Sequence, residues 1–318
     1  MKANRRAVID VGTNSVKLLV ADVRDGVVEP VMEQGEQTRL GAGFYETRRL
    51  QPQAIAHSAE VVASFAAKAR ELRAVSTRVI ATSAARDAVN PADLTSAIEQ
   101  ASGLKVEIIS GEQEADWVFR GVTTTPELAA QPLLLLDVGG GSTEFILGRG
   151  GDKHFAKSYA LGTVRLLEHL PHGDLPAAAE LAANRKWVKD FLAKAVRPDL
   201  EPALERETRA NSGQRFVQLI GTGGTAAVLA RMEARLESYD RGRIEATRLG
   251  ITQTKAQVER LWALPLAERK KITGLPRDRA DVILPGVVIY EGVMEEFGFQ
   301  ELRVSTRGLR FAAVMDAA

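Results

Sequence analysis

Runs of apolar residues near the start of the chain are separated by short polar turns, and this pattern predicts an antiparallel sheet. Apolar runs at residues 6–11 and 15–23 are joined by a Gly-Thr-Asn turn, and residues 27–32 predict a third strand. Apolar residues then recur at spacings of three and four over residues 51–72, which predicts a helix with Pro52 in its first turn. The remaining predicted elements of this half are strands at 78–82 and 105–109 and helices at 91–102 and 112–119.

The polar, proline-containing stretch at residues 123–132 predicts a domain boundary, after which a second set of elements begins. Its predicted strands are 133–138, 143–148, 153–159, 216–220 and 302–305, and its predicted helices are 176–196, 225–232, 254–264, 280–297 and 309–315. Residues 197–215 are charged and poorly periodic, which predicts a surface excursion, and Pro285 predicts a kink in its helix. Strands followed by alternating strands and helices are typical of a mixed α/β architecture.

An internal repeat connects the two halves. Residues 7–20 read AVIDVGTNSVKLLV and residues 134–147 read LLLDVGGGSTEFIL, an offset of 127 residues. Each copy predicts a strand, a tight glycine turn and a returning strand, and the glycine lets backbone N–H groups approach an anion closely. One copy alone would be read as an ordinary hairpin. Two aligned copies, one in each predicted domain, favour the binding of a chain of phosphates.

The length and composition of the chain exclude several classes of protein and of functional site. A length of 318 residues favours two domains, and 42 basic against 41 acidic residues leave a net charge of +1, which gives no global attraction to nucleic acid or to an anionic membrane. The absence of cysteine excludes disulfides, thiolate catalysis and cysteine metal sites. The start of the chain has no long apolar segment of the kind that a secretory signal needs. We therefore expect a cytoplasmic protein without nucleic-acid or membrane partners.

Several separated segments resemble a known family. The two hairpins, together with Gly-Thr-Gly-Gly-Thr at 221–225, resemble the superfamily of acetate and sugar kinases, Hsp70 and actin. Within it, the chain most resembles the Ppx/GppA phosphatases, which are exopolyphosphatases and guanosine pentaphosphate phosphohydrolases. The further segments that carry this resemblance are ATSAAR (81–86), ISGEQEA (109–115), LGTVR (161–165), RADVILPG (279–286) and STRGLR (305–310).

The resemblance implies a fold of two actin-like, ribonuclease H-like α/β domains flanking a cleft. We expect residues 1–128 and about 304–318 to form the first domain and residues 129–303 the second, with the last turns packed on the first domain. We also expect the domains to open and close about residues 123–132. Longer relatives carry a further helical domain that this chain lacks, so a preference for short substrates is compatible with the resemblance. A homodimer is also compatible with it.

The resemblance also assigns catalytic roles. Glu114 is expected to be the general base, Arg86 to clamp a phosphate, and Glu144 to position the water or the metal. Asp137, with Glu144, is the expected ligand of Mg²⁺ or Mn²⁺, and this agrees with the preference of magnesium for few carboxylates, several waters and substrate phosphates. Without the resemblance, a glutamate at position 114 would be read as a solvated residue that favours the helix dipole.

Phosphate binding is predicted for the two hairpin turns, for the residues beside them and for the later glycine-rich loop. These residues are Asp10, Gly12, Thr13, Asn14, Ser15, Lys17, Gly139, Gly140, Gly141, Ser142, Thr143, Gly221, Thr222, Gly223, Gly224 and Thr225. Lys17 stands where many relatives carry arginine. Arg165 is a weaker candidate, and Arg303, Arg307 and Arg310 are read as an exposed face.

The predicted function is Mg²⁺-dependent release of terminal orthophosphate from inorganic polyphosphate, through a water that Glu114 activates. The nearest alternative is a 5'-phosphohydrolase of guanosine pentaphosphate, because both substrates present a terminal phosphate on a polyphosphate. More distant alternatives are an ATP-dependent kinase of the actin-like superfamily and a sensor without activity. The carboxylates Glu114, Glu144 and Asp137 argue against the sensor.

Overall fold

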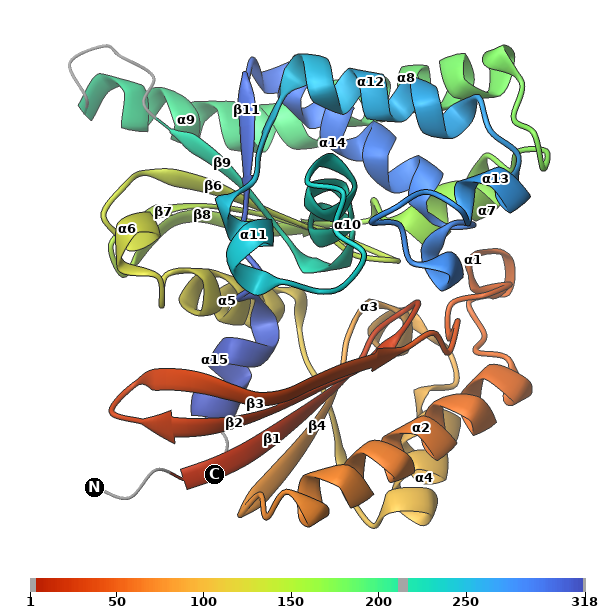
Figure 1. The fold of residues 1–318 in the computed structure, drawn as a ribbon, viewed down its shortest axis with the longest axis vertical. Helices are drawn as coiled ribbons and strands as arrows, with labels where there is room; N and C mark the ends of the chain where they lie inside the picture. The colour runs from red at the N-terminus through yellow and green to blue at the C-terminus, as the bar shows by residue number, and fades with distance from the viewer. Residues whose placement is uncertain (1–3, 211–216, 317–318) are drawn as a thin grey trace. The chain divides into compact units, whose positions relative to one another are not determined.

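A computed structural model describes residues 4–210 and 217–316. The contacts within the chain divide it into two compact units (Figure 1). Unit 1 comprises Met1–Thr124 and Arg307–Ala318, and unit 2 comprises Thr125–Thr306. Each unit has its own sheet and its own hydrophobic core.

Unit 1 is built on a five-stranded sheet with the order β3-β2-β1-β4-β5. Its strands are β1 (Asn4–Val11), β2 (Val16–Arg24), β3 (Val27–Glu36), β4 (Ser76–Ala81) and β5 (Val106–Ile108). The first three form an antiparallel meander, whereas β4 runs parallel to β1 and β5 parallel to β4. The carboxyl ends of β1, β4 and β5 therefore meet at one edge of the sheet.

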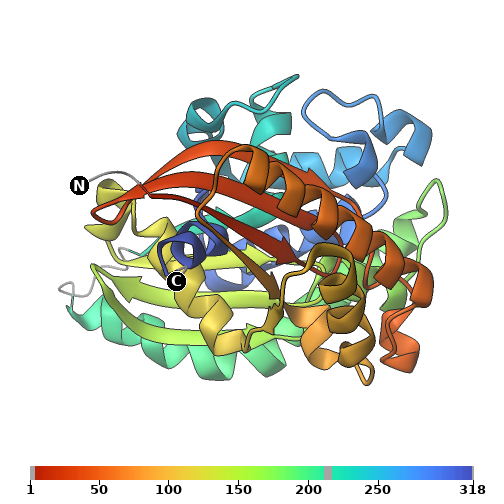
Figure 2. The same ribbon diagram turned by 90° about the horizontal axis from the view of Figure 1, so that it is seen from below.

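Helices cover both faces of this sheet, as Figures 1 and 2 show for α2 and Figure 1 for α15. The helices of unit 1 are α1 (Phe44–Thr47), α2 (Pro52–Glu71), α3 (Ser83–Asp87), α4 (Pro91–Ser102), α5 (Gly111–Val122) and α15 (Leu309–Met315). Alternate residues of a strand point to opposite faces. Ile9 accordingly packs in the core that α2 and α4 complete, whereas α15 packs against β1 and β2 from the other side.

The last helix, α15, is fixed within unit 1 by contacts with α5. A Cβ at Gly121 would overlap the carbonyl of Gly308, so the two segments approach as closely as glycine permits. Asp316 accepts hydrogen bonds from Trp117 Nε1 at 3.0 Å and from Arg120 Nη2 at 2.7 Å. The chain thus returns to unit 1 after it leaves unit 2.

Unit 2 repeats the arrangement with a six-stranded sheet in the order β10-β11-β9-β6-β7-β8. Its strands are β6 (Leu133–Val138), β7 (Thr143–Arg149), β8 (Asp152–Tyr159), β9 (Gln218–Thr222), β10 (Arg248–Gly250) and β11 (Glu301–Val304). Strands β6 to β8 form an antiparallel meander, and β9 runs parallel to β6, as β4 does to β1. Strand β10 adds an antiparallel edge that unit 1 does not have.

The core of unit 2 lies between one face of this sheet and a set of helices. The helices are α6 (Pro126–Ala129), α7 (Thr163–His169), α8 (Ala178–Phe191), α9 (Arg197–Ala210), α10 (Gly223–Glu233), α11 (Arg241–Ala246), α12 (Ile251–Trp262), α13 (Leu266–Arg269) and α14 (Ile283–Phe297). Leu134, Leu136 and Phe145 pack in the core with side chains of α8, α10, α12 and α14. Tyr290 of α14, fully buried, donates to the carbonyl of Leu136 at 3.2 Å.

Two predictions from the chain pattern are wrong. Residues 197–210 are not a surface excursion, because α8, a π-helical turn (Leu192–Val196) and α9 follow one another without a break. The charges of this segment obscure Leu200, Ala203 and Leu204, which recur at helical spacing and are buried. Residues 211–216, which include the predicted start of a strand at Phe216, lie outside the described residues.

The predicted kink at Pro285 is the second error. Helix α14 begins at Ile283, so Pro285 lies in its first turn. The first N–H groups of a helix have no intrahelical partner, so a proline there removes no helical hydrogen bond. None of the helices in residues 4–210 and 217–316 combines the length and the apolar character that crossing a membrane would require.

Candidate active site

The two repeated hairpins have the same backbone turn. In the Gly12 turn (residues 12–15), the N–H of Gly12 donates to the carbonyl of Ser15 at 3.0 Å. In the Gly139 turn (residues 139–142), the N–H of Gly139 donates to the carbonyl of Ser142 at 2.9 Å. A Cβ at either glycine would lie 3.1 Å from that carbonyl, so both turns favour a residue without a side chain.

The residue opposite the aspartate differs between the hairpins. Asp10 of β1 pairs with Lys17 of β2, whereas Asp137 of β6 pairs with Glu144 of β7. Burial raises the pKa of Asp10 above its ordinary value, and the nearby charges of Lys17 and Arg310 oppose this rise. In unit 1, cationic side chains therefore lie near Asp10. In unit 2, a second carboxylate, Glu144, lies opposite Asp137.

Glu144 is held in one orientation. Its side chain is 1% exposed, and its Oε1 accepts hydrogen bonds from Ser142 Oγ at 2.8 Å and from Ser158 Oγ at 2.7 Å. Asp137 lies against Gly223, where a Cβ would overlap its Oδ1 and where φ is +79°. Glycine is therefore favoured at position 223 both by the backbone conformation and by the space that the carboxylate takes.

The donor set of unit 2 suits a hard divalent cation. Asp137 and Glu144 offer oxygen ligands from adjacent strands, and magnesium completes such a pair with waters and substrate phosphates. Within residues 4–210 and 217–316, no three or more His, Cys, Asp or Glu side chains gather into a metal-binding cluster. Asp137 and Glu144 are the pair that the sequence predicts as metal ligands, and the pairing of β6 with β7 places them opposite each other.

The glycine-rich loop at 221–225 joins β9 to the start of α10. Thr222, fully buried, precedes the helix, and the first N–H groups of α10 have no partner within the helix. A Cβ at Gly224 would lie 2.7 Å from Arg279 Nη2, and burial lowers the pKa of Arg279 below its ordinary value. Thr225 Oγ1 donates to the carbonyl of Val138 at 3.3 Å, so its hydroxyl ties the loop to β6.

The Gly139 turn is held by a segment whose sequence did not predict a helix. Helix α7 begins beside this turn, and its N–H groups donate to the carbonyls of the turn. Thr163 N donates to Gly139 O at 3.0 Å and Val164 N to Gly140 O at 2.8 Å. These hydrogen bonds fix the carbonyls of the turn against the start of α7.

Three further contacts join the Gly139 turn and Thr143 beside it to residues 161–165. Arg165 Nε donates to the carbonyl of Gly141 at 2.7 Å, and a Cβ at Gly162 would lie 2.5 Å from the carbonyl oxygen of Gly140. The hydroxyl of Thr143 donates to the carbonyl of Leu161 and is buried there. The Leu-Gly-Thr-Val-Arg segment was the only signal of this arrangement in the sequence, and its pattern did not predict a helix.

The Gly12 turn is held by a different kind of segment. The loop after β3 passes beside it, and Arg39 N donates to Asn14 O at 3.0 Å while Gly41 N donates to Thr13 O at 2.7 Å. Asn14 Nδ2 donates to Gln37 Oε1 at 2.6 Å, so the Asn14 side chain also has a fixed orientation. A Cβ at Gly41 would overlap Thr13 Cγ2. No sequence pattern predicted that residues 37–41 belong to this site.

Glu114 and Arg86 form an ion pair in unit 1. Ser110 caps α5, which places Glu114 in the first turn of that helix. Arg86 Nη1, at the end of α3, donates to Glu114 Oε2 at 2.9 Å and to the carbonyl of Ile109 at 3.1 Å. The side chains of Glu114 and Arg86 are 12% and 23% exposed, so both are largely buried at the edge of the sheet.

The structure thus gathers the predicted residues into one group in each unit. In unit 1, the Gly12 turn, Arg86 and Glu114 follow the carboxyl ends of three adjacent strands. In unit 2, the Gly139 turn and the loop at 221–225 follow β6 and β9, which are also adjacent. Arg310, read from the sequence as part of an exposed face, instead donates to the carbonyl of Leu18 at 2.7 Å.

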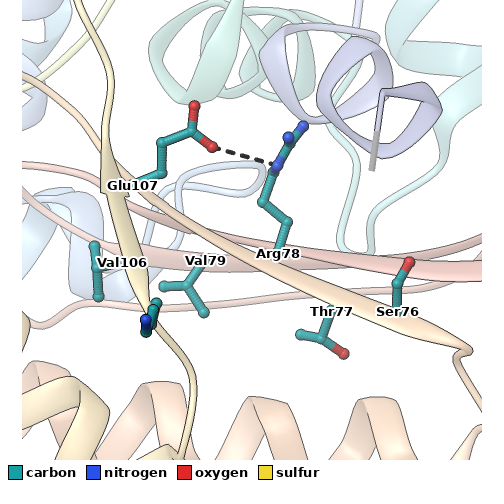
Figure 3. Close-up of a pocket in the computed structure, with 7 residues that line it drawn as sticks. Ser76, Thr77, Arg78, Val79, Val106 and Glu107 are labelled. Carbon is teal, nitrogen blue, oxygen red and sulfur yellow. Dashed lines mark ion pairs between the residues drawn. The ribbon is translucent and has the colours of Figure 1, made fainter. Parts of the chain in front are cut away.

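A pocket of about 310 Å³ elsewhere in unit 1 holds none of these residues (Figure 3). It lies at the amino ends of β4 and β5, opposite the end that carries Arg86 and Glu114. Arg78 and Glu107 form an ion pair there, with 3.4 Å between Nε and Oε2. The lining residues are Ser76, Thr77, Arg78, Val79, Lys105, Val106 and Glu107.

Comparison with known proteins finds similarity over nearly the whole chain. The model of the Ppx/GppA phosphatase family matches residues 19–317. Exopolyphosphatase 2 of Mycobacterium tuberculosis is 33% identical over 96% of each chain. A guanosine-5'-triphosphate,3'-diphosphate pyrophosphatase of Photobacterium profundum is 29% identical over 98% of this chain and 58% of its own. The crystal structure of the Aquifex aeolicus Ppx/GppA family member superposes with a TM-score of 0.76 at 28% identity, covering 98% of this chain and 96% of that one.

Proposed function

The chain belongs to the Ppx/GppA phosphatase family, and from this premise we propose that it releases terminal orthophosphate from inorganic polyphosphate. As a member of this phosphatase family, the chain is a phosphoanhydride hydrolase. Polyphosphate is supported by the similarity to exopolyphosphatase 2, which extends over nearly the whole of both chains. The alternative substrate is guanosine pentaphosphate, which the similarity to the Photobacterium profundum protein supports. A cytoplasmic location and a homodimer stay predictions.

The repeated turn is the observation that carries this proposal. Both turns close with the same N–H to carbonyl hydrogen bond, and both follow the carboxyl end of a strand. Such turns bind anions without the help of a cationic side chain. Two of them in one chain suit a substrate with several phosphates better than one with a single phosphate.

In the proposed reaction, a water molecule attacks the terminal phosphorus. A bond forms between the water oxygen and phosphorus, the bridging P–O bond breaks, and the shortened chain leaves with its electron pair. Glu114 accepts the proton of the attacking water, a role for which a carboxylate must lie within hydrogen-bond reach. The ion pair with Arg86 fixes the orientation of this carboxylate.

Arg86 has donors left for the substrate. A guanidinium carries five N–H donors, and the bonds of Arg86 to Glu114 and to the carbonyl of Ile109 both come from Nη1. We propose that Nε and Nη2 bind oxygens of the phosphate that is attacked. The same arginine would then hold the base and the terminal phosphate.

Asp137 and Glu144 are the residues that we propose to bind Mg²⁺ or Mn²⁺. A divalent cation bound there would neutralise charge on the phosphate oxygens. Ser142 and Ser158 hold Glu144 in position for this role. Further phosphate-binding groups in this proposal are the Gly12 turn and Lys17 in unit 1, and the Gly139 turn and the start of α10 at residues 223–225 in unit 2.

Phosphate release by the purified protein tests the proposal. Tripolyphosphate, long-chain polyphosphate, guanosine pentaphosphate and ATP are supplied in parallel with Mg²⁺. We expect release from polyphosphate, and we expect Glu114→Gln to lower kcat by about 10²–10⁴-fold, the usual contribution of a general base. Glu112→Gln is the matched control, because Glu112 lies two residues away on the same helix and is exposed. Equal activity of the two variants would overturn the role of Glu114.

A further inference from the structure

The pocket of about 310 Å³ in unit 1 lies where β4 and β5 separate. Strand β5 begins at Val106, which pairs with Val79, so the preceding residues Ser76–Arg78 pair with β1 alone among the described strands. Figure 3 shows Ser76 and Arg78 on one side of β4, the side on which Glu107 lies, as the alternation of side chains along a strand requires. Polar side chains therefore line the gap between the two strands.

Two hydrogen-bond donors in this lining are buried. They are Ser76 Oγ and Arg78 Nη1, and within residues 4–210 and 217–316 neither has a hydrogen-bond partner. Buried donors of this kind cost free energy unless a water or a ligand accepts from them. The guanidinium of Arg78 also has a fixed place, because it lies over the ring of Trp117, 5.4 Å from the ring centre. The pocket therefore holds donors in position for a ligand.

The charges of the lining favour an anion. Arg78 and Lys105 are cations, and Glu107 is the carboxylate among the lining residues. Arg78 Nε lies 3.4 Å from Glu107 Oε2, and the Glu107 side chain is 50% exposed. Because ion pairs at the surface are weak, this carboxylate can turn to solvent when an anion binds Arg78. Asp316 also lies near Arg78, but its two oxygens accept hydrogen bonds from other side chains of unit 1.

A second pocket, in unit 2, differs in this respect. It has about 520 Å³ and is lined by α8, the start of α9 and α14. Arg185 in its lining donates to Glu291 at 2.7 Å, and Arg197 donates to Glu296 at 2.8 Å. The guanidinium groups of that pocket therefore bind carboxylates of the protein itself. The pocket of unit 1 is the one of the two whose lining has buried donors in want of an acceptor.

We propose that the pocket of unit 1 binds a phosphate-type oxyanion, either orthophosphate or the end of a polyphosphate chain. In this site Arg78 Nη1 and Ser76 Oγ donate to oxygens of the anion, and Lys105, which is exposed, adds a second positive charge. A tetrahedral oxyanion suits these donors better than water does, because it brings several acceptor oxygens together. Binding here needs no chemical step, so the inference goes beyond the proposed function and does not depend on it.

The site is separate from the residues of the proposed reaction. Arg86 and Glu114 follow the carboxyl ends of β4 and β5, whereas the pocket lies at their amino ends. A strand rises about 3.3 Å per residue, so the two ends of β4 (Ser76–Ala81) are roughly 16 Å apart. Substitutions in the pocket should therefore leave kcat for phosphate release within about twofold of its ordinary value, as expected of distant sites without shared partners.

The indole of Trp117 gives a direct measurement, because Arg78 lies over its ring. The chain has three tryptophans, so ¹⁵N-labelled protein gives three indole N–H signals, and Trp117→Phe identifies the signal of Trp117. Orthophosphate and tripolyphosphate are titrated separately, with sodium chloride at equal ionic strength as the control. We expect a saturable shift of the Trp117 signal, with a Kd that Arg78→Gln raises by at least about tenfold, as the loss of a charged hydrogen bond does. Saturation by orthophosphate identifies a single phosphate as sufficient, and saturation by tripolyphosphate alone identifies the chain.

Two milder variants keep the test decisive if Arg78→Gln, which uncovers Trp117, melts early. Ser76→Ala removes a hydroxyl that makes no hydrogen bond within the described residues, so the fold should be kept while Kd rises by about fivefold. Lys105→Gln should raise Kd by about twofold, because an exposed charge contributes little. Lys189→Gln is its matched control, since Lys189 is an exposed lysine that lines the pocket of unit 2.

Three results would overturn the site. One is no shift of the Trp117 signal with either phosphate compound, and another is the same shift with chloride. The third is an equal Kd in the unsubstituted protein, Arg78→Gln and Ser76→Ala. Trp117 lies three residues after Glu114 on α5, so that result would place the bound anion at the other end of the strands. Phosphate release takes no part in the titration, so failure of this proposal and failure of the proposed function are distinguishable.

Discussion

The two Asp-Val-Gly hairpins share a backbone turn but differ in the side chain across from the aspartate. Lys17 stands there in unit 1 and Glu144 in unit 2, at equivalent positions of the strand pairs. The shared turn is the feature that we propose to bind phosphate in both units. On this difference rests our proposal of a division of labour, in which unit 1 offers a cation to phosphate and unit 2 offers carboxylates to a metal.

The segments that hold the turns differ as well. In unit 2 the N–H groups of a regular helix, α7, donate to the turn, whereas in unit 1 an irregular loop does so with Arg39 in a left-handed conformation. Consecutive residues of α7, Thr163, Val164 and Arg165, donate to carbonyls of the Gly139 turn. The loop of unit 1 is not helical, and it places an exposed arginine, Arg39, beside the Gly12 turn.

The largest expected effect concerns the residue opposite the aspartate, which differs between the two hairpins. We expect Glu144→Gln to lower kcat by about a hundredfold, because it removes the charge that positions the water or the metal. Lys17→Gln should mainly raise KM, by about tenfold, because it removes one charged contact with phosphate. Steady-state phosphate release measures both constants. Matching effects of the two substitutions would contradict the division of labour.

The two aspartates should differ in their effect on the Mg²⁺ concentration that the reaction requires. Asp137→Asn is expected to raise the Mg²⁺ concentration for half-maximal activity by at least about tenfold, since even residues behind metal ligands have effects of this size. Asp10→Asn should leave that concentration nearly unchanged, because Asp10 lies beside Lys17 and Arg310. A magnesium titration of each variant makes the measurement. A shift of the same size in both would mean that unit 1 also binds the metal.

The support of the turns can be tested at the two glycines that touch them. A Cβ at Gly162 meets the backbone carbonyl of Gly140 at 2.5 Å, whereas a Cβ at Gly41 first meets the methyl group of Thr13. We therefore expect Gly162→Ala to destabilise the protein by about 1–3 kcal/mol, as forced overpacking does. Gly41→Ala should cost less, and adding Thr13→Ser should restore part of the loss because serine lacks that methyl. Urea unfolding gives the differences, and no rescue by Thr13→Ser would contradict the assigned clash.

The smallest expected effect is a pH dependence of stability that comes from Asp10. Burial raises the pKa of Asp10 above its ordinary value of 3.8, so the folded protein holds this proton more tightly than the unfolded chain does. The free energy of unfolding therefore falls as pH rises from about 3.8 through the pKa of the folded state, and the loss persists above it. Asp10→Asn lacks this titration.

The gain in stability from Asp10→Asn should accordingly be larger at about pH 7 than at about pH 4. Urea unfolding of the unsubstituted protein and the variant at the two pH values measures it. A difference that stays constant with pH would show that the buried carboxyl keeps an ordinary pKa.

Much of the fold follows from local patterns in the sequence. The hairpin around the Gly12 turn, the strand Leu133–Val138 and the helix Pro91–Ser102 were predicted within a residue or two, because alternating apolar runs and glycine or proline boundaries are local signals. Helix α9 was missed because its charged residues outnumber the few apolar ones that it buries.

The contacts that complete the site could not be predicted in this way. Arg86 and Glu114 are 28 residues apart and meet only because β4 and β5 are neighbours in the sheet. The hydrogen bonds from Arg39 and Gly41 to the Gly12 turn are made by backbone N–H groups, which every residue except proline carries, so no residue type marks them. Pairing across the sheet, rather than composition, determines these contacts.

The most direct test of the account follows oxygen from water into product. Polyphosphate of defined length is incubated with the purified protein and Mg²⁺ in ¹⁸O-labelled water, with and without ADP, and the products are resolved by mass spectrometry and ³¹P NMR. Hydrolysis at the chain end predicts orthophosphate that carries one ¹⁸O atom and chains shortened by one phosphate at a time, whether or not ADP is present. Intermediate-length fragments as first products, or formation of ATP in place of labelled orthophosphate, would contradict it.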